Sequence, residues 1–97
     1  MKQEERLERV KIALNITGDY QNDTIQSYID EVIEFMCDAG VSREIAESKT
    51  AIGTIARGVS DLWNYGANNT TYSNYFLQRV IQLSYKRDDR VEGDEND

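Results

Sequence analysis

The helical repeat of apolar side chains along residues 23–65 constrains this chain most. Between residues 25 and 39 the apolar positions recur every three or four residues and share one side of a helical wheel, while polar and acidic residues take the other side. That period predicts an amphipathic α-helix and excludes the alternation of a half-buried strand. Residues 38–42 (Asp-Ala-Gly-Val-Ser) interrupt the pattern before a second helical stretch. Two helices joined by a tight turn therefore form the predicted centre of the fold.

The rest of the chain predicts one helix on each side of this pair. The sequence has 97 residues and no proline, which suits a single small domain of unbroken helices. We expect an all-α bundle of four helices, at about residues 3–14, 23–39, 43–65 and 73–85. A polar loop is predicted at 66–72, the domain spans 1–85, and 86–97 form a flexible, disordered charged tail.

Residues that suit helix ends stand at these boundaries. The expected C-caps are Gly18 and Gly40, and the expected N-caps are Asn22 or Asp23, Ser42, and Thr71 or Ser73.

Acidic residues are concentrated in the middle of the chain. The net charge is −7, and residues 19–47 hold eight acids and one base. Such a surface argues against affinity for a phosphate backbone, which needs clustered Lys and Arg. The acids on the outer side of the second helix are Asp30, Glu31, Glu34 and Asp38. They form either a merely solvated face or a surface with a function.

The residue inventory gives no support for catalysis. The chain has no histidine, so the commonest general base and the commonest metal ligand are both missing. Asp30, Glu34 and Asp38 recur at four-residue spacing, but a solvated face explains them better than a carboxylate metal site. We expect no catalytic residues, no metal and no cofactor.

One false signal is the turn at 39–42, which is typical of helix-turn-helix DNA readers. The following positions that should be buried carry Ala46 and Lys49, and the exposed start carries Glu44 and Glu47. Acids there repel DNA.

Small residues form a stripe along the predicted third helix: Ala46, Thr50, Gly53 and Ser60. A glycine inside a helix costs about 1 kcal/mol relative to alanine, so a close contact is expected to compensate. That contact is either another helix of the same chain or a neighbouring subunit.

The last helix has apolar residues on two sides. Tyr75, Ile81 and Tyr85 fall outside the predicted inner face, and Lys86 and Arg87 follow them directly. This is more exposed apolar surface than a small domain usually carries, so we expect a partner to dock here. No apolar run approaches the 18 residues of a membrane span, and we expect neither a membrane segment nor a secretory signal.

Over residues 7–86 the chain resembles the small head–tail connector (adaptor) proteins of tailed phages. A first helix at 7–14 leads into an Asp/Asn-rich connector at 18–23. An isoleucine-rich helix follows, and then a long helix that ends in Asp-Leu-Trp-Asn-Tyr-Gly at 61–66. The last helix comes after a polar loop.

The resemblance implies a structural virion protein, assembled in the host cytoplasm as a ring of twelvefold symmetry. It implies the phage portal protein and a stopper or tail-completion protein as partners, with DNA passing through the ring without sequence-specific binding. The acidic face would then line the channel, and Tyr75, Ile81, Tyr85, Lys86 and Arg87 would meet the portal. Two other hypotheses stay open: a small acidic protein-binding regulator or DNA mimic, and a helix-turn-helix DNA-binding regulator.

Overall fold

The computed structural model describes residues 1–65 and 72–86, and these contain helices and turns but no strand. The helices are α1 (Gln3–Ala13), α2 (Asn22–Asp38), α3 (Arg43–Ala46), α4 (Ile52–Tyr65) and α5 (Asn74–Ser84), with a 3₁₀ turn, η1 (Lys49–Ala51), before α4. The predicted all-α bundle is confirmed. The loop predicted at 66–72, except for Tyr72, and the tail predicted at 86–97, except for Lys86, lie outside the described residues.

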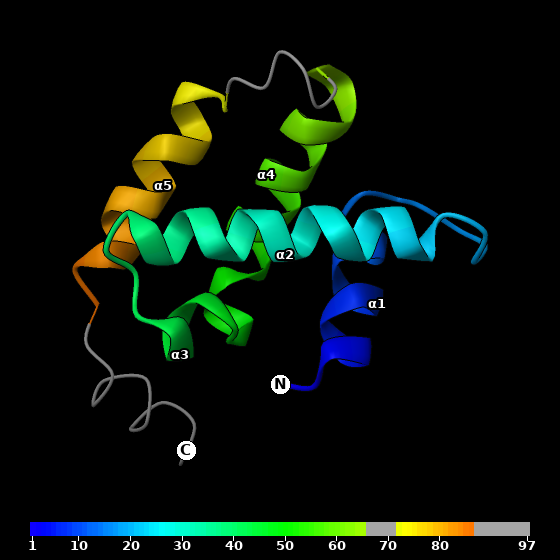
Figure 1. Ribbon diagram of the computed structural model, residues 1–97, viewed down its shortest axis with the longest axis horizontal. Helices are drawn as coiled ribbons and strands as arrows, with labels where there is room; N and C mark the ends of the chain where they lie inside the picture. The colour runs from blue at the N-terminus through cyan, green and yellow to red at the C-terminus, as the bar shows by residue number, and fades with distance from the viewer. Residues whose placement is uncertain (66–71, 87–97) are drawn as a thin grey trace.

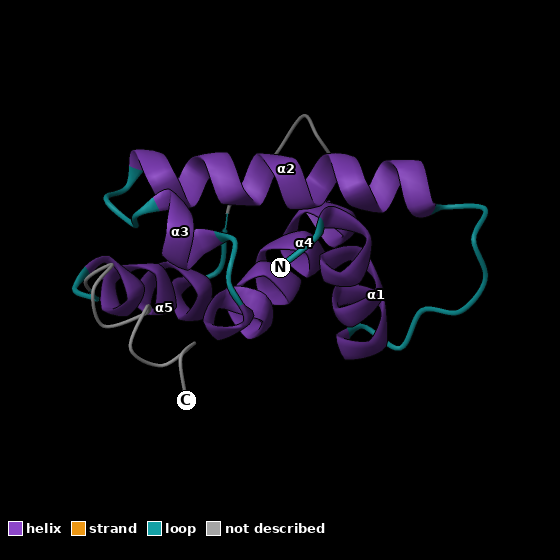
Figure 2. Ribbon diagram, turned by 90° about the horizontal axis from the view of Figure 1, so that it is seen from below, coloured by secondary structure: helices purple, strands orange, loops and turns teal. Residues whose placement is uncertain are grey.

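The helices form two layers. Figure 2 shows α2 as one layer, with α1, α4 and α5 on a single side of it. In Figure 1, α2 crosses α4, while α1 lies toward one end of α2 and α5 toward the other. Because α4 packs against α1, α2 and α5, it is the central element of the bundle.

The core follows the predicted periodicity of α2. Ile25, Ile29, Val32 and Met36 are fully buried, one turn apart, and belong to the same core cluster as Ile55 and Val59 of α4. Each aliphatic side chain removed from water contributes about 1.5 to 3 kcal/mol. The apolar contact between α2 and α4 therefore contributes strongly to the stability of the described part.

A glycine sets the closest approach in this core. A Cβ added to Gly58 would lie 2.7 Å from Cε1 of Phe76 and 2.9 Å from both γ-methyl groups of Val32. These neighbours come from α5 and α2, so the three helices meet at a point where only a hydrogen fits.

The prediction of one continuous helix over 43–65 is wrong. The chain leaves the helix after Ala46, passes through an extended Ser48 (φ −94°, ψ 169°), and becomes helical again only through η1. The Ser48 hydroxyl donates to the Ile45 carbonyl at 2.7 Å, which satisfies a carbonyl that a continuing helix would have used. The break turns α4 into a new direction, against α1 and α2.

Two helices end with the same cap. After α2, Gly40 has φ 106°, and the Val41 N–H donates to the Met36 carbonyl at 3.0 Å, as predicted for a left-handed cap. After α1 this position belongs to Asn15 (φ 59°) instead of Gly18, because α1 ends at Ala13. Asparagine tolerates the left-handed region better than other side chains with a Cβ.

The expected N-cap of α2 is also wrong, and a buried lysine explains it. No side chain caps α2, whose N-cap is Gln21. The Asn22 side-chain oxygen instead accepts a hydrogen bond from Lys11 Nζ at 2.8 Å. The same ammonium donates to the Gly18 carbonyl at 2.7 Å and to Asp19 at 3.1 Å, and Lys11 is only 4% exposed. Lys11 thus holds the α1–α2 connector.

The two glycines of α4 make a matched pair for testing this packing. Gly58→Ala is expected to lower the free energy of unfolding by about 1 to 3 kcal/mol, because Val32 and Phe76 must move aside. Gly53→Ala meets nothing within 4 Å and should raise stability by up to about 1 kcal/mol through helix propensity. Urea unfolding of both variants measures the difference, and equal shifts would contradict the close packing at Gly58.

Candidate docking surface

The outer side of α5 exposes large side chains while its inner side is buried. Tyr75, Ile81 and Tyr85 have exposed fractions of 60%, 54% and 79%. The buried residues are Phe76, Val80 and Leu83. Ile81 and Tyr85 lie one helical turn apart on one side, but Tyr75 lies on a different side of the helix. We refer to Tyr75, Ile81, Tyr85 and Lys86 as the α5 surface; Arg87 lies outside the described residues.

A buried carboxylate fixes where α5 begins. Asp61 of α4 is 3% exposed and accepts a hydrogen bond from the Ser73 N–H at 2.9 Å. Ser73 in turn caps α5, since its hydroxyl accepts from the Phe76 N–H at 3.2 Å. Arg57 donates to that hydroxyl at 3.3 Å, and its guanidinium carbon lies 5.6 Å from the Tyr75 ring centroid. Ser73 was one of the two predicted caps, and Thr71, the other, lies outside the described residues. Asp61 and Arg57 were missed, although their four-residue spacing was visible in the sequence.

Aromatic rings connect the start of α5 to α2. The Tyr72 ring stacks on Phe76 with centroids 4.5 Å apart and contacts Phe35 of α2 at 4.7 Å. Burial, together with the charges of Glu31 and Asp61, raises the pKa of the Tyr72 phenol to about 12. The phenol therefore stays neutral in the folded chain well above its ordinary pKa of 10.0.

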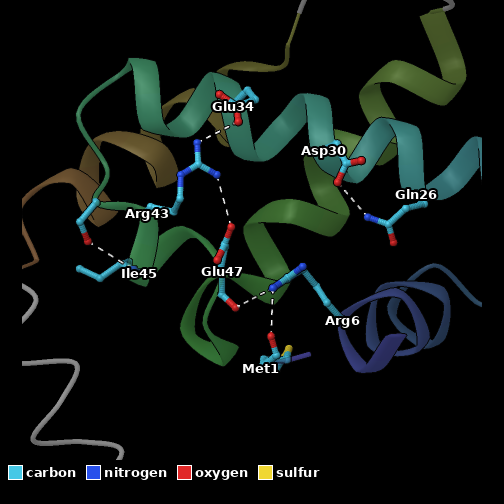
Figure 3. Close-up of polar contacts among 9 residues, drawn as sticks. Met1, Arg6, Gln26, Asp30, Glu34, Arg43, Ile45 and Glu47 are labelled. Carbon is cyan, nitrogen blue, oxygen red and sulfur yellow. Dashed lines mark hydrogen bonds and ion pairs between the residues drawn. The ribbon is translucent and has the colours of Figure 1, made fainter. Parts of the chain in front are cut away.

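The predicted acidic face of α2 is exposed, but not all of it is free. Asp30, Glu31, Glu34 and Asp38 all lie on the surface. Glu34 pairs with Arg43 of α3 at 2.8 Å, and Asp30 accepts from Gln26 at 2.9 Å (Figure 3). The hydrogen bond to Glu34, together with other nearby groups that include Glu47, raises the pKa of Arg43.

Arginines tie the short α3 to the helices around it. Figure 3 shows Arg43 between Glu34 and Glu47, and Arg6 of α1 donating to the carbonyls of Met1 and Glu47. Since α3 is only four residues long, it offers no recognition helix for a DNA groove, and the helix-turn-helix hypothesis loses its structural basis.

The four small residues do not form one stripe, because the break after Ala46 separates them. Ala46 is buried in α3, whereas Thr50 in η1 and Gly53 in α4 are exposed. Ser60 is partly buried and lines an apolar hollow beside Trp63. Within the described chain the glycine in close contact is Gly58 and not Gly53. Contact of Thr50 or Gly53 with a neighbouring subunit stays a prediction.

No group of three or more His, Cys, Asp or Glu side chains in 1–65 and 72–86 is arranged to hold a metal ion. Nor does any helix in these ranges have the length and apolarity needed to cross a membrane.

The hydrogen bond between the Ser73 N–H and the Asp61 carboxylate predicts that loss of this one side chain strongly lowers stability. Asp61→Ala is expected to lower the free energy of unfolding by about 1 to 3 kcal/mol, because the Ser73 N–H loses its acceptor. Asp30→Ala, which removes an exposed carboxylate of α2, should change it by less than about 0.5 kcal/mol. Chemical denaturation tests both, and equal losses would mean that Asp61 does not clamp α5.

The Tyr72 pKa predicts how stability falls in strong alkali. Between pH 10 and about 12 the unfolded chain releases the Tyr72 proton while the folded chain keeps it, so stability decreases as the pH rises through this window. Tyr72→Phe should remove this pH dependence of stability. In an ultraviolet absorbance titration, the variant should also lack the phenol that titrates near pH 12. An unchanged titration in the variant would contradict the assignment.

The chain matches a known protein family over most of its length. The family model described as phage gp6-like head–tail connector protein matches residues 4–97, nearly the whole chain. Neither curated proteins nor solved structures gave a significant match. The chain therefore belongs to the phage gp6-like head–tail connector family, a family of structural virion proteins.

Proposed function

We propose that this chain assembles into a ring between the portal and the stopper or tail and extends the DNA channel at the head vertex. The observation that carries the proposal is the family match over residues 4–97. The all-α fold with an exposed α5 surface supports it, because an assembly component needs apolar side chains free for partners. Twelvefold symmetry, matching the portal, is part of the proposal.

The α5 surface is the proposed contact with the portal, together with Arg87. Aromatic residues supply large contact areas with little loss of side-chain entropy, and hot spots at interfaces are enriched in tyrosine. Tyr85 is the most exposed of the three large side chains, and Asp61 and Gly58 hold the helix that carries it. The surface is therefore presented by a helix whose position is already fixed.

The acidic face of α2 is the proposed wall of the channel. Lys and Arg on such a wall would retain the phosphates of passing DNA through counterion release, whereas carboxylates let it slide. Glu31 and Asp38 are exposed with no ion pair among the described residues, and Glu34 is shared with Arg43. The same carboxylates would also suit an acidic regulator or DNA mimic, which is the alternative function.

Sedimentation with the portal tests the connector proposal. Analytical ultracentrifugation of the chain with the portal ring of the same phage should show about one connector chain per portal subunit. Tyr85→Asp should weaken this complex by about 2 kcal/mol, or roughly thirtyfold in Kd, because it places a charge in an apolar contact.

Tyr20→Asp is the matched control. Tyr20 is 87% exposed in the α1–α2 connector, away from α5, so its substitution should leave portal binding unchanged. If the chain does not bind the portal at any salt concentration, the connector proposal is wrong. Binding to basic proteins that weakens steeply with salt would then favour the acidic regulator.

A further inference from the structure

A cavity of about 380 Å³ opens at the C-terminal end of α5. Its described walls come from η1 and from the last turns of α5: Thr50, Arg79, Gln82, Leu83, Tyr85 and Lys86. Two of these residues are cationic and none is acidic, although the chain has 18 acids and 11 bases. The cavity therefore differs in charge from most of the molecule.

The two cations in this wall have no carboxylate partner in the described part of the chain. Ion pairs there engage Arg9, Lys11, Arg43 and Arg57. Arg79 donates one hydrogen bond, from Nη1 to the Gln82 side-chain oxygen at 2.7 Å, and the guanidinium has four more N–H donors. Gln82 also lines the cavity, so the remaining N–H donors of Arg79 are available there to an incoming carboxylate.

The walls define the ligand that fits. The cations Arg79 and Lys86 favour a ligand with carboxylates. Tyr85, which is 79% exposed, and the edge of Leu83 add an apolar surface. A matching ligand is an extended acidic segment that carries an apolar side chain. Residues 88–92 of this chain read Asp-Asp-Arg-Val-Glu, with three acids and one arginine around one valine, so the segment has a net charge of about −2.

This segment also begins beside the cavity. Lys86 lines it, and Asp88 follows two residues later, within about 7 Å along an extended chain. A ligand attached by so short a connection has a high effective concentration, so individually weak contacts suffice to hold it. We propose that residues 88–92 dock into the cavity of their own chain, with carboxylates at Arg79 and Lys86 and Val91 at Tyr85.

The proposal does not depend on the connector function, because it concerns the free chain. Exposed ion pairs are weak and screened by salt, so the docking is reversible. While docked, the segment covers Tyr85 and Lys86, and a partner that binds these two residues has to displace it.

Nuclear magnetic resonance of the full chain tests the proposal. Replacing Asp88, Asp89 and Glu92 by Asn, Asn and Gln is expected to shift the backbone amide signals of Thr50 and Arg79. These two residues line the cavity, and neither is a direct sequence neighbour of the segment. The wild-type signals should move toward the same positions at about 1 M salt, where the screening length is about 3 Å.

The control removes three carboxylates just beyond the docking segment. Replacing Asp94, Glu95 and Asp97 by Asn, Gln and Asn changes the net charge equally and should leave the Thr50 and Arg79 signals in place. In an Arg79→Gln and Lys86→Gln background, neutralising residues 88–92 should no longer shift Thr50, whereas a Lys2→Gln background should keep the shift.

Three outcomes would overturn the proposal. The first is identical Thr50 and Arg79 signals with and without the acids of 88–92. The second is an equal shift from both neutralised variants, which would report net charge alone. The third is a shift that disappears on tenfold dilution, which would assign the segment to a neighbouring chain.

Discussion

The absence of a side chain at Gly58 is the constraint on which the rest of the bundle depends. It lets Val32 of α2 and Phe76 of α5 approach one point of α4, where a methyl group would lie less than 3 Å from both. Because interiors are packed at crystal-like density, α2 and α5 have no equivalent alternative position. The packing of the buried side of α5 in the core thus fixes the outward direction of Ile81 and Tyr85.

Polar contacts complete what packing begins. Asp61 is buried, and burying a carboxylate is unfavourable unless it is hydrogen-bonded. Here it receives the Ser73 N–H and lies 3.7 Å from Arg57 Nε, so the first turn of α5 has a defined start. An interface on a helix with a frayed start would lose entropy on binding. A helix fixed at its start and along its buried side avoids most of that loss.

The sequence predicted those features that depend on local pattern. The period of α2, the cap at Gly40 and the cap at Ser73 are all local, and the structure confirms them. The break at Ser48 was missed because no proline or glycine marks it; it relies on a side-chain hydrogen bond and on Arg6 from α1, 41 residues before Glu47.

Contacts between residues far apart in the sequence also give the two glycines of α4 different surroundings. Gly53 and Gly58 look alike in the sequence, and only the neighbours of the folded chain show that Gly58 is packed and Gly53 is open. The α5 surface was predictable in part, since Ile81 and Tyr85 break the apolar period of their helix. The cavity beside it was not, because Thr50 reaches it from another element.

An exposed apolar surface on a free assembly component carries a risk, because chains can associate through it before their partner is present. The net charge of −7 opposes that association over distances of a Debye length, but it does not shield the surface itself. An acidic segment docked at Arg79 and Lys86 would cover part of it with the chain's own residues. Such a cover is selective, since a partner must offer more than salt-screened ion pairs to replace it. A partner that buries Tyr85 in an apolar contact meets that condition, whereas a second acidic chain does not.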